Sequence, residues 1–187
     1  MQHLPRSCVD ALRYSRRPMR SFSCLTLLLF VGCTKAAPSS TLSQDPLDFT
    51  LPLYPSKEPF SLASERGHVV MLDVWATWCD PCRESLPQYQ GLAAKYAARG
   101  LRLYTLNVDS ETAVPVELPK FITETKLSLP ILLDTDARLS EELFKVKVMP
   151  TALLIDRKGR VRHVHEGFES KSLAEVTSHL EALLSEP

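Results

Sequence analysis

Short apolar runs, rich in β-branched and aromatic residues, alternate along this chain with stretches in which apolar residues recur every three or four positions. The first pattern predicts strands and the second predicts helices. The predicted strands are residues 49–51, 69–75, 101–108, 131–133, 151–155 and 161–165. The predicted helices are residues 83–99, 119–126, 137–145 and 170–185. Asp156-Arg157-Lys158-Gly159 is a tight-turn sequence, so the last two strands should form a hairpin.

The order of these elements predicts an α/β domain, because strands and helices alternate and a hairpin precedes the last helix. We expect a central sheet that mixes parallel and antiparallel strands, with helices on both faces. The domain should cover residues 47–187, a length that suits one compact unit with its own hydrophobic core.

The first 33 residues have the pattern of a signal peptide. A basic start around Arg20 leads into a mostly apolar run, residues 22–31, which is too short to span a bilayer. Met19 is an alternative start of translation, because the segment before it is longer and more polar than a signal peptide needs. Residues 34–46 consist largely of Ser, Thr, Ala and Pro, and this composition predicts a flexible tether.

The end of the apolar run, Leu29-Phe30-Val31-Gly32-Cys33, resembles the lipobox of bacterial lipoproteins. This resemblance implies that Cys33 is lipidated and becomes the first residue of the mature protein. The protein would then be anchored to a membrane through lipid, on the extracytoplasmic side. An ordinary signal peptide, cut near Ala36-Ala37, is the alternative.

The charge balance changes when the signal peptide is set aside. The whole chain has 22 basic and 22 acidic residues. Residues 1–33 hold five arginines and one aspartate, so the remainder has 17 basic and 21 acidic residues and a net charge of −4. A mildly acidic domain without a basic stripe argues against nucleic-acid binding.

Two cysteines lie where the strand at residues 69–75 should give way to a helix. Cys79 and Cys82 are separated by two residues, and Pro81 suits the first turn of the helix. The free N–H groups and the dipole at a helix start favour a thiolate, so Cys79 is predicted to be a nucleophile. The spacing therefore predicts a dithiol redox site.

A metal site is the first alternative for this cysteine pair. A four-thiolate zinc site needs a second pair, and no cysteine follows Cys82. A mixed site would have to recruit His163 and His165, which point to the same side of a strand, and a solvated face is the simpler explanation for them. The sequence therefore favours redox chemistry, with no metal and no cofactor.

Four motifs connect this cysteine pair with a known family. The motifs are Asp48-Phe49-Thr50-Leu51 at the start of the domain, Trp75-Ala76-Thr77-Trp78-Cys79 before the helix, Pro87 within the helix, and Met149-Pro150-Thr151 before a strand. With these motifs the chain resembles the TlpA-like and ResA-like thiol–disulfide oxidoreductases, which have a thioredoxin-like fold and are tethered to bacterial membranes. The resemblance extends from about residue 48 to the C-terminus.

The resemblance implies a role for each central residue of the site. Cys79 attacks a disulfide of a partner protein, and Cys82 then resolves the mixed disulfide. Asp73, on a strand expected to be buried, accepts the proton of Cys82; an aspartate bonded only to local backbone is the alternative. Pro150 matches a cis-proline of the family, a state that the sequence itself does not indicate.

Four further residues are expected to lie at the substrate. Met149 offers its backbone to an extended segment of the partner, and Trp78 shields the site. Asp80 and Pro81 lie beside Cys79. The carboxylate of Asp80 opposes a thiolate on Cys79, so the pair is expected to act as a reductant.

The implied partners are disulfide-containing proteins, as in cytochrome c maturation, and a membrane thiol reductase that restores the dithiol. Two other functions fit part of the pattern. A copper-binding chaperone on a thioredoxin fold would have a wider cysteine spacing and an added histidine. A peroxidase would have a single reactive cysteine with Pro and Thr upstream, and no proline precedes Thr77 in the strand.

Overall fold

The computed structural model describes residues 45–187 of the chain. The predicted signal peptide, the predicted lipidation site at Cys33 and residues 34–44 of the predicted tether lie outside the described residues. Within the described part, no helix combines the length and the apolar character that crossing a membrane requires.

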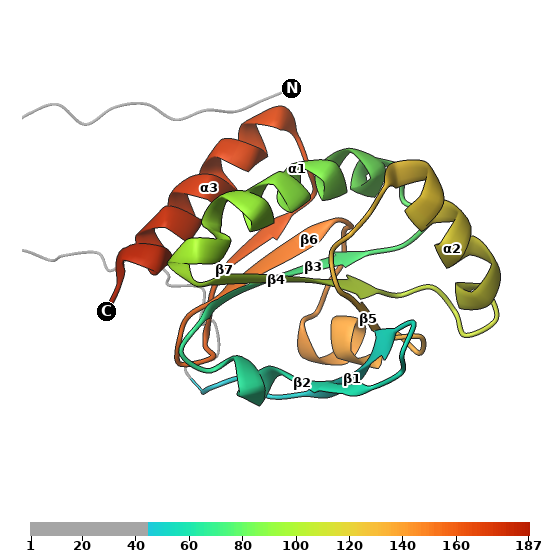
Figure 1. The fold of residues 1–187 in the computed structure, drawn as a ribbon, viewed down its shortest axis with the longest axis horizontal. Coiled ribbons are helices and arrows are strands. Elements are labelled where there is room, and N and C mark those ends of the chain that lie inside the picture. Colours follow the sequence, from blue (N-terminus) through green and yellow to red (C-terminus); the bar gives the residue numbers. More distant parts are fainter. Residues whose placement is uncertain (1–44) are drawn as a thin grey trace, which may run out of the picture. The chain divides into compact units, whose positions relative to one another are not determined.

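A sheet of seven strands forms the centre of the domain (Figure 1). In spatial order the strands are β2 (Pro59–Ser61), β1 (Thr50–Tyr54), β5 (Ile131–Leu133), β4 (Leu101–Asn107), β3 (Val69–Trp75), β6 (Thr151–Ile155) and β7 (Val161–Glu166). Strands β3, β4 and β5 run parallel, whereas β1 and β6 are antiparallel to both of their neighbours. The sheet is therefore mixed, as predicted.

Three α-helices cover one face of this sheet, and shorter elements cover the other. The long helices are α1 (Asp80–Tyr96), which the 3-10 turn η2 (Ala97–Arg99) extends, α2 (Val114–Thr125) and α3 (Ser170–Ser185). Helices α1 and α3 run side by side over the sheet (Figure 1). The opposite face of the central strands β3, β4 and β6 packs against the β1–β2 hairpin at one edge of the same sheet, and against the 3-10 helix η1 (Leu62–Glu65) and the π-helix η3 (Leu139–Leu143).

Alternation along β3 sorts its side chains between two hydrophobic clusters. Met71 and Trp75 belong to the cluster beneath the three α-helices. Leu72 and Val74 belong to the cluster on the opposite face. Asp73 alternates in phase with Met71 and Trp75, so its carboxyl group faces the helices.

Three of the four predicted helices differ from the observed ones, and the first, predicted at residues 83–99, begins at Asp80 and ends at Tyr96. Helix α2 begins at Val114, five residues earlier than predicted, and Pro119 lies inside it. Pro115 occupies the first turn, where the missing N–H of a proline costs no hydrogen bond, so it favours a helix start before Pro119. The predicted helix at residues 137–145 is the short π-helix η3.

Candidate active site

The cysteine pair lies where β3 ends and α1 begins. A short loop after Trp75 leads to Cys79, which is the N-cap residue of α1. Cys79 and Cys82 are joined in a disulfide, with their Cα atoms 5.3 Å apart. Asp80 and Pro81 form the first turn of α1, as the sequence predicts. The two thiols are therefore placed for reversible disulfide chemistry.

The two sulfur atoms differ in their access to solvent. Cys79 is 5% exposed, whereas Cys82 is fully buried one helical turn further along. At the start of a helix the first N–H groups lack intrahelical partners, and they favour negative charge on the nearby Cys79 sulfur once the disulfide is reduced. The order of exposure agrees with the predicted order of attack.

Asp73 is a buried carboxyl group on the same side of the sheet as the cysteine pair. It is fully buried, and neither of its oxygens has a hydrogen-bond partner among the described residues. The alternative that Asp73 bonds to local backbone is therefore wrong. Burial raises the pKa of Asp73 well above its usual range. Burial and then the charge of Asp73 also raise the pKa of Tyr89, on the buried side of α1.

Two polar residues at the end of β4 hold the loop that precedes Cys79. The backbone N–H of Thr77 donates to both carboxylate oxygens of Asp109, at 3.1 and 3.3 Å, and its hydroxyl donates to one of them at 3.1 Å. The side-chain amide of Asn107 donates to Asp109 at 2.9 Å. All of these residues are buried. Asp109 is therefore a positioning residue for the active-site loop.

Asp109 and Asn107 are not among the site residues predicted from the sequence, although their position in the chain carries a signal. Both lie at the carboxyl end of β4, the strand that runs parallel to β3 and next to it. Side chains at the carboxyl ends of adjacent parallel strands meet at one edge of the sheet, which is where sites of α/β proteins form. Two polar residues at that position were a sign of a supporting role.

The loop at Met149 and Pro150 lies at the same end of the sheet as the cysteines. The peptide bond between these two residues is cis, as the family resemblance implied. Thr151, the next residue, pairs with Val74 near the end of β3, so the loop lies opposite the turn that leads to Cys79. The Thr151 hydroxyl donates a hydrogen bond of 2.5 Å to the carbonyl three residues earlier and closes the loop.

Apolar side chains project into solvent around this end of the sheet. Trp78 is 69% exposed, and Val148, which precedes the cis-proline loop, is 48% exposed. Beside Trp78 lies a hollow of about 340 Å³, which Thr77, Asp109, Ser110, Ala113 and Glu117 also line. Met149 is partly buried and packs against the hydrophobic clusters on both faces. The surroundings of the cysteine pair therefore offer apolar contacts to a second protein.

The chain is similar to a known protein family over about two thirds of its length. The model of the AhpC/TSA family matches residues 42–164. The chain belongs to the AhpC/TSA family.

Curated relatives of this chain are thiol–disulfide oxidoreductases by name. It is 30% identical to ResA of Geobacillus thermodenitrificans over 177 residues, which make up 91% of this chain and 98% of that protein. It is 33% identical to ResA of Oceanobacillus iheyensis over 106 residues, which make up 57% of this chain and 53% of that protein. The match therefore spans nearly all of one relative and about half of the other.

Solved structures confirm the thioredoxin-like fold. A Chlorobium tepidum protein assigned as thiol:disulfide interchange protein DsbE superposes with a TM-score of 0.69 and 33% identity, covering 77% of this chain and 98% of that one. StoA of Bacillus subtilis has a TM-score of 0.57 and 27% identity, covering 72% of this chain and 99% of that one. With the joined Cys79 and Cys82, these relatives identify a thiol–disulfide oxidoreductase.

Proposed function

We propose that this protein is a membrane-anchored reductant of disulfide bonds in partner proteins and acts on the extracytoplasmic side. The observation that carries the chemistry is the Cys79–Cys82 disulfide at the start of α1, with the buried Asp73, which has no hydrogen-bond partner within residues 45–187, on the same side of the sheet. The location and the anchor rest on the signal-peptide pattern and on the lipobox-like sequence that ends in Cys33. Cytochrome c maturation, to which the family resemblance points, is the setting we propose.

The reaction starts from the reduced pair. The Cys79 thiolate attacks one sulfur of a substrate disulfide, a Cys79–substrate disulfide forms, and the other substrate sulfur leaves as a thiolate. Asp73 takes the proton of Cys82, and the Cys82 thiolate then attacks the Cys79 sulfur. The second substrate thiolate leaves, and two electrons have passed to the substrate. The protein is left as the disulfide, and a membrane thiol reductase restores the dithiol.

The substrate would lie across the exposed apolar rim of the site. Trp78 and Val148 supply apolar contacts on the two loops that face one another. The backbone of Met149, beside the cis-proline, is placed to pair with an extended segment of the partner. Binding through backbone and apolar contacts suits a protein that reduces more than one partner.

A redox titration tests the direction of electron flow. The purified full chain is equilibrated in glutathione and dithiothreitol buffers, and the thiols of Cys79 and Cys82 are counted by alkylation and mass spectrometry. We expect a midpoint nearer to about −270 mV, typical of thioredoxin, than to about −120 mV, typical of DsbA. A midpoint more oxidising than about −180 mV would contradict the role of reductant.

Cell fractionation tests the anchor. We expect Cys33→Ala to move the protein from the membrane fraction to the soluble fraction. Cys24→Ala, a matched change at a cysteine inside the predicted signal peptide, should leave it in the membrane fraction. Equal distribution of the two variants would contradict lipidation at Cys33, without any bearing on the redox chemistry of the domain.

A further inference from the structure

Three of the five histidines of the chain meet at one edge of the sheet, between the edge strand β7 and α3. His163 and His165 are two residues apart on β7, and His179 stands on α3. The rings of His163 and His179 stack, with centroids 3.8 Å apart and planes inclined by 7°. The expectation that this face of the strand is solvated is wrong, because all three rings are partly buried where α3 packs against β7.

The contact between His165 and His179 has the spacing of two ligands on one metal ion. The Nε2 atom of His165 and the Nδ1 atom of His179 are 3.2 Å apart. Two zinc–nitrogen bonds of about 2.0–2.1 Å at a tetrahedral angle would hold their nitrogens about 3.3 Å apart. A hydrogen bond between the two rings accounts for the same distance only if one nitrogen is protonated and the other is not.

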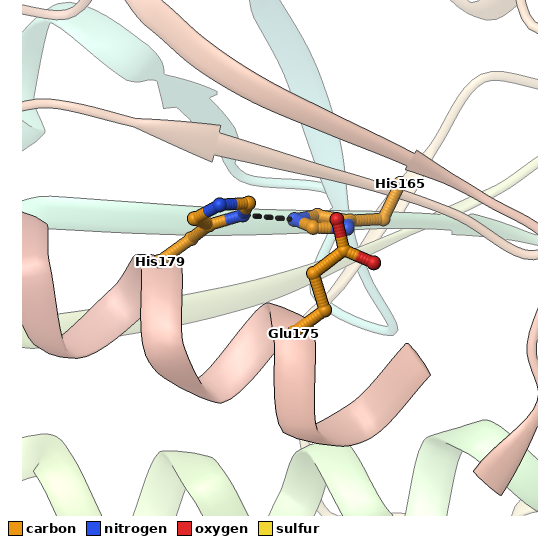
Figure 2. A group of neighbouring side chains, drawn as sticks. All are labelled: His165, Glu175 and His179. Carbon is orange, nitrogen blue, oxygen red and sulfur yellow. Dashed lines mark hydrogen bonds between the residues drawn. The ribbon is translucent and has the colours of Figure 1, made fainter. Parts of the chain in front are cut away.

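Glu175 supplies a third donor to this pair. It lies four residues before His179 on α3, so both side chains project from the same face of the helix. Its carboxylate turns towards the two rings (Figure 2), and the three donor atoms lie within 4.8 Å of one another. The carboxylate side chain is exposed, so it can close the remaining distance without moving the backbone.

We propose that His165, His179 and Glu175 form a binding site for a borderline divalent transition-metal ion such as Zn²⁺, separate from the cysteine pair. Two imidazoles and one carboxylate are a common donor set for zinc, with a fourth position left to water. His163 is not a ligand in this arrangement; its stacked ring fixes the orientation of His179.

The site belongs to a different part of the sheet from the dithiol. His165 pairs with Ala152 of β6, and Ala152 pairs with Asp73 of β3, so two strand spacings separate His165 from Asp73. That is about 9–10 Å between backbones. A metal bound here would link β7 to α3 and stabilise the folded state, and it would not contact the reacting sulfur atoms.

Zinc and cobalt titrations of the full chain test the proposal. The protein is kept oxidised so that Cys79 and Cys82 remain a disulfide, and its other thiols are capped with iodoacetamide, which removes thiolates as competing ligands. Calorimetry should give one equivalent of bound Zn²⁺, and Co²⁺ should give the visible bands of a tetrahedral site. We expect His165→Gln and His179→Gln each to weaken binding by at least about tenfold, and Glu175→Gln by about tenfold.

His68→Gln is the matched control, because this partly buried histidine lies beside Arg102 and away from the cluster. It should bind zinc as the native chain does. All four variants should keep the native rate of reaction of Cys79 with a disulfide. Should a histidine variant fail to fold, as judged by circular dichroism, the exposed Glu175→Gln carries the test. Native zinc affinity in the cluster variants, or no bound equivalent in the native chain, would overturn the proposal.

Discussion

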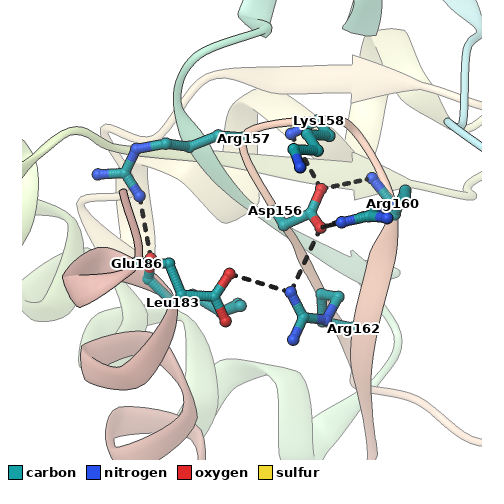
Figure 3. Close-up of polar contacts among 7 residues, drawn as sticks. All are labelled: Asp156, Arg157, Lys158, Arg160, Arg162, Leu183 and Glu186. Carbon is teal, nitrogen blue, oxygen red and sulfur yellow. Dashed lines mark hydrogen bonds and ion pairs between the residues drawn. The ribbon is translucent and has the colours of Figure 1, made fainter.

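Two buried aspartates, one at each end of the central sheet, have opposite surroundings. Asp73 lies towards the cysteine end of β3, and its oxygens have no hydrogen-bond partner among the described residues. Asp156 lies at the other end, after β6. Its oxygens accept backbone hydrogen bonds from Lys158 and Arg160, both at 2.9 Å, and side-chain contacts from Arg160 and Arg162 at 3.0–3.4 Å (Figure 3).

These surroundings shift the two pKa values in opposite directions. Burial alone would raise the pKa of Asp156, but hydrogen bonds from Arg160 and Lys158 lower it below its usual range. At Asp73 burial acts without such bonds from any residue that the structure describes, so the pKa rises. The two buried carboxyl groups therefore have different roles. Asp156 stays ionised and holds a turn, whereas Asp73 can bind a proton beside the dithiol.

The Asp156 end of the sheet also joins the hairpin to the last helix. Arg157 donates to the carbonyl of Leu183 at 2.9 Å, and Arg162 pairs with Glu186 at 3.0 Å (Figure 3). A basic side chain on the last carbonyls of a helix is favourable, because these groups lack intrahelical partners. This end of the molecule is therefore built for stability, and the cysteine end for chemistry.

The largest effect should come from the cysteines themselves, at the reactive end. Cys79→Ser should lower the rate of disulfide exchange by at least about a thousandfold, because only Cys79 is accessible to attack. Cys82→Ser should instead trap a mixed disulfide on Cys79, which mass spectrometry of the purified variant detects. Both variants should keep the circular dichroism spectrum of the native protein. Trapping through Cys82 in the Cys79→Ser variant would show that the order of attack is reversed.

Asp73→Asn keeps the shape of the side chain and removes the carboxyl group that can accept a proton. Resolution of the mixed disulfide should slow by about a hundredfold at pH 7, while the first attack by Cys79 is unchanged. The loss should shrink at high pH, where Cys82 ionises without help. Stopped-flow measurement of the two steps across pH checks this, and an unchanged second step would remove Asp73 from the mechanism.

Asp73→Asn should also change the pH dependence of stability. The raised pKa means that the native protein loses stability as pH rises above about 3.9, the value in the unfolded chain, until the folded carboxyl ionises. The variant lacks this loss of stability. The difference in free energy of unfolding between the variant and the native protein should therefore grow in favour of the variant from pH 4 to pH 8 and reach at least about 1 kcal/mol. Denaturant unfolding of the oxidised chain at several pH values measures it.

Asp156→Asn should change stability in the opposite direction from Asp73→Asn and leave disulfide exchange unchanged. We expect it to lower the free energy of unfolding by about 1–3 kcal/mol at pH 7, because buried hydrogen bonds to a charged group are lost. In the native protein the pKa of Asp156 is lowered. The extra stability of the native protein over the variant is therefore complete above about pH 4, and it disappears as the pH falls through the pKa of Asp156 in the folded state. The rate of disulfide exchange should not change. A stability difference that stays the same from pH 7 into the acid range would mean that the charge of Asp156 is not the cause.

The smallest effect should come from Trp78→Ala, at the rim of the reactive end. Reduction of a protein disulfide should slow by about fivefold, since about 1 kcal/mol of apolar contact with the partner is lost. Reduction of glutathione disulfide, which is too small to use the rim, should be unaffected. Val164→Ala removes an exposed apolar residue from β7 and serves as the control. Equal slowing with both substrates would place Trp78 in the chemistry and not in docking.

The sequence alone determined the parts of the molecule that local pattern encodes. The apolar run before Cys79 located the strand, and the proline after Cys79 located the helix start. The spacing of the two cysteines located the dithiol. The apolar run at residues 69–75, expected to form a buried strand, predicted that Asp73 would be buried, and the Asp156 turn predicted the hairpin. These features depend on residues close together in the chain, where backbone preference and side-chain period act directly.

Only the tertiary structure decided which distant residues meet. Thr77 bonds to Asp109, 32 residues away, and His165 lies beside His179, 14 residues away, because β4 and α3 pack next to the elements that precede them. The absence of hydrogen-bond partners for Asp73 in the described part of the chain depends in the same way on every segment that surrounds it. Such contacts follow from how elements pack across the whole core, and no local pattern of polar and apolar residues carries that information.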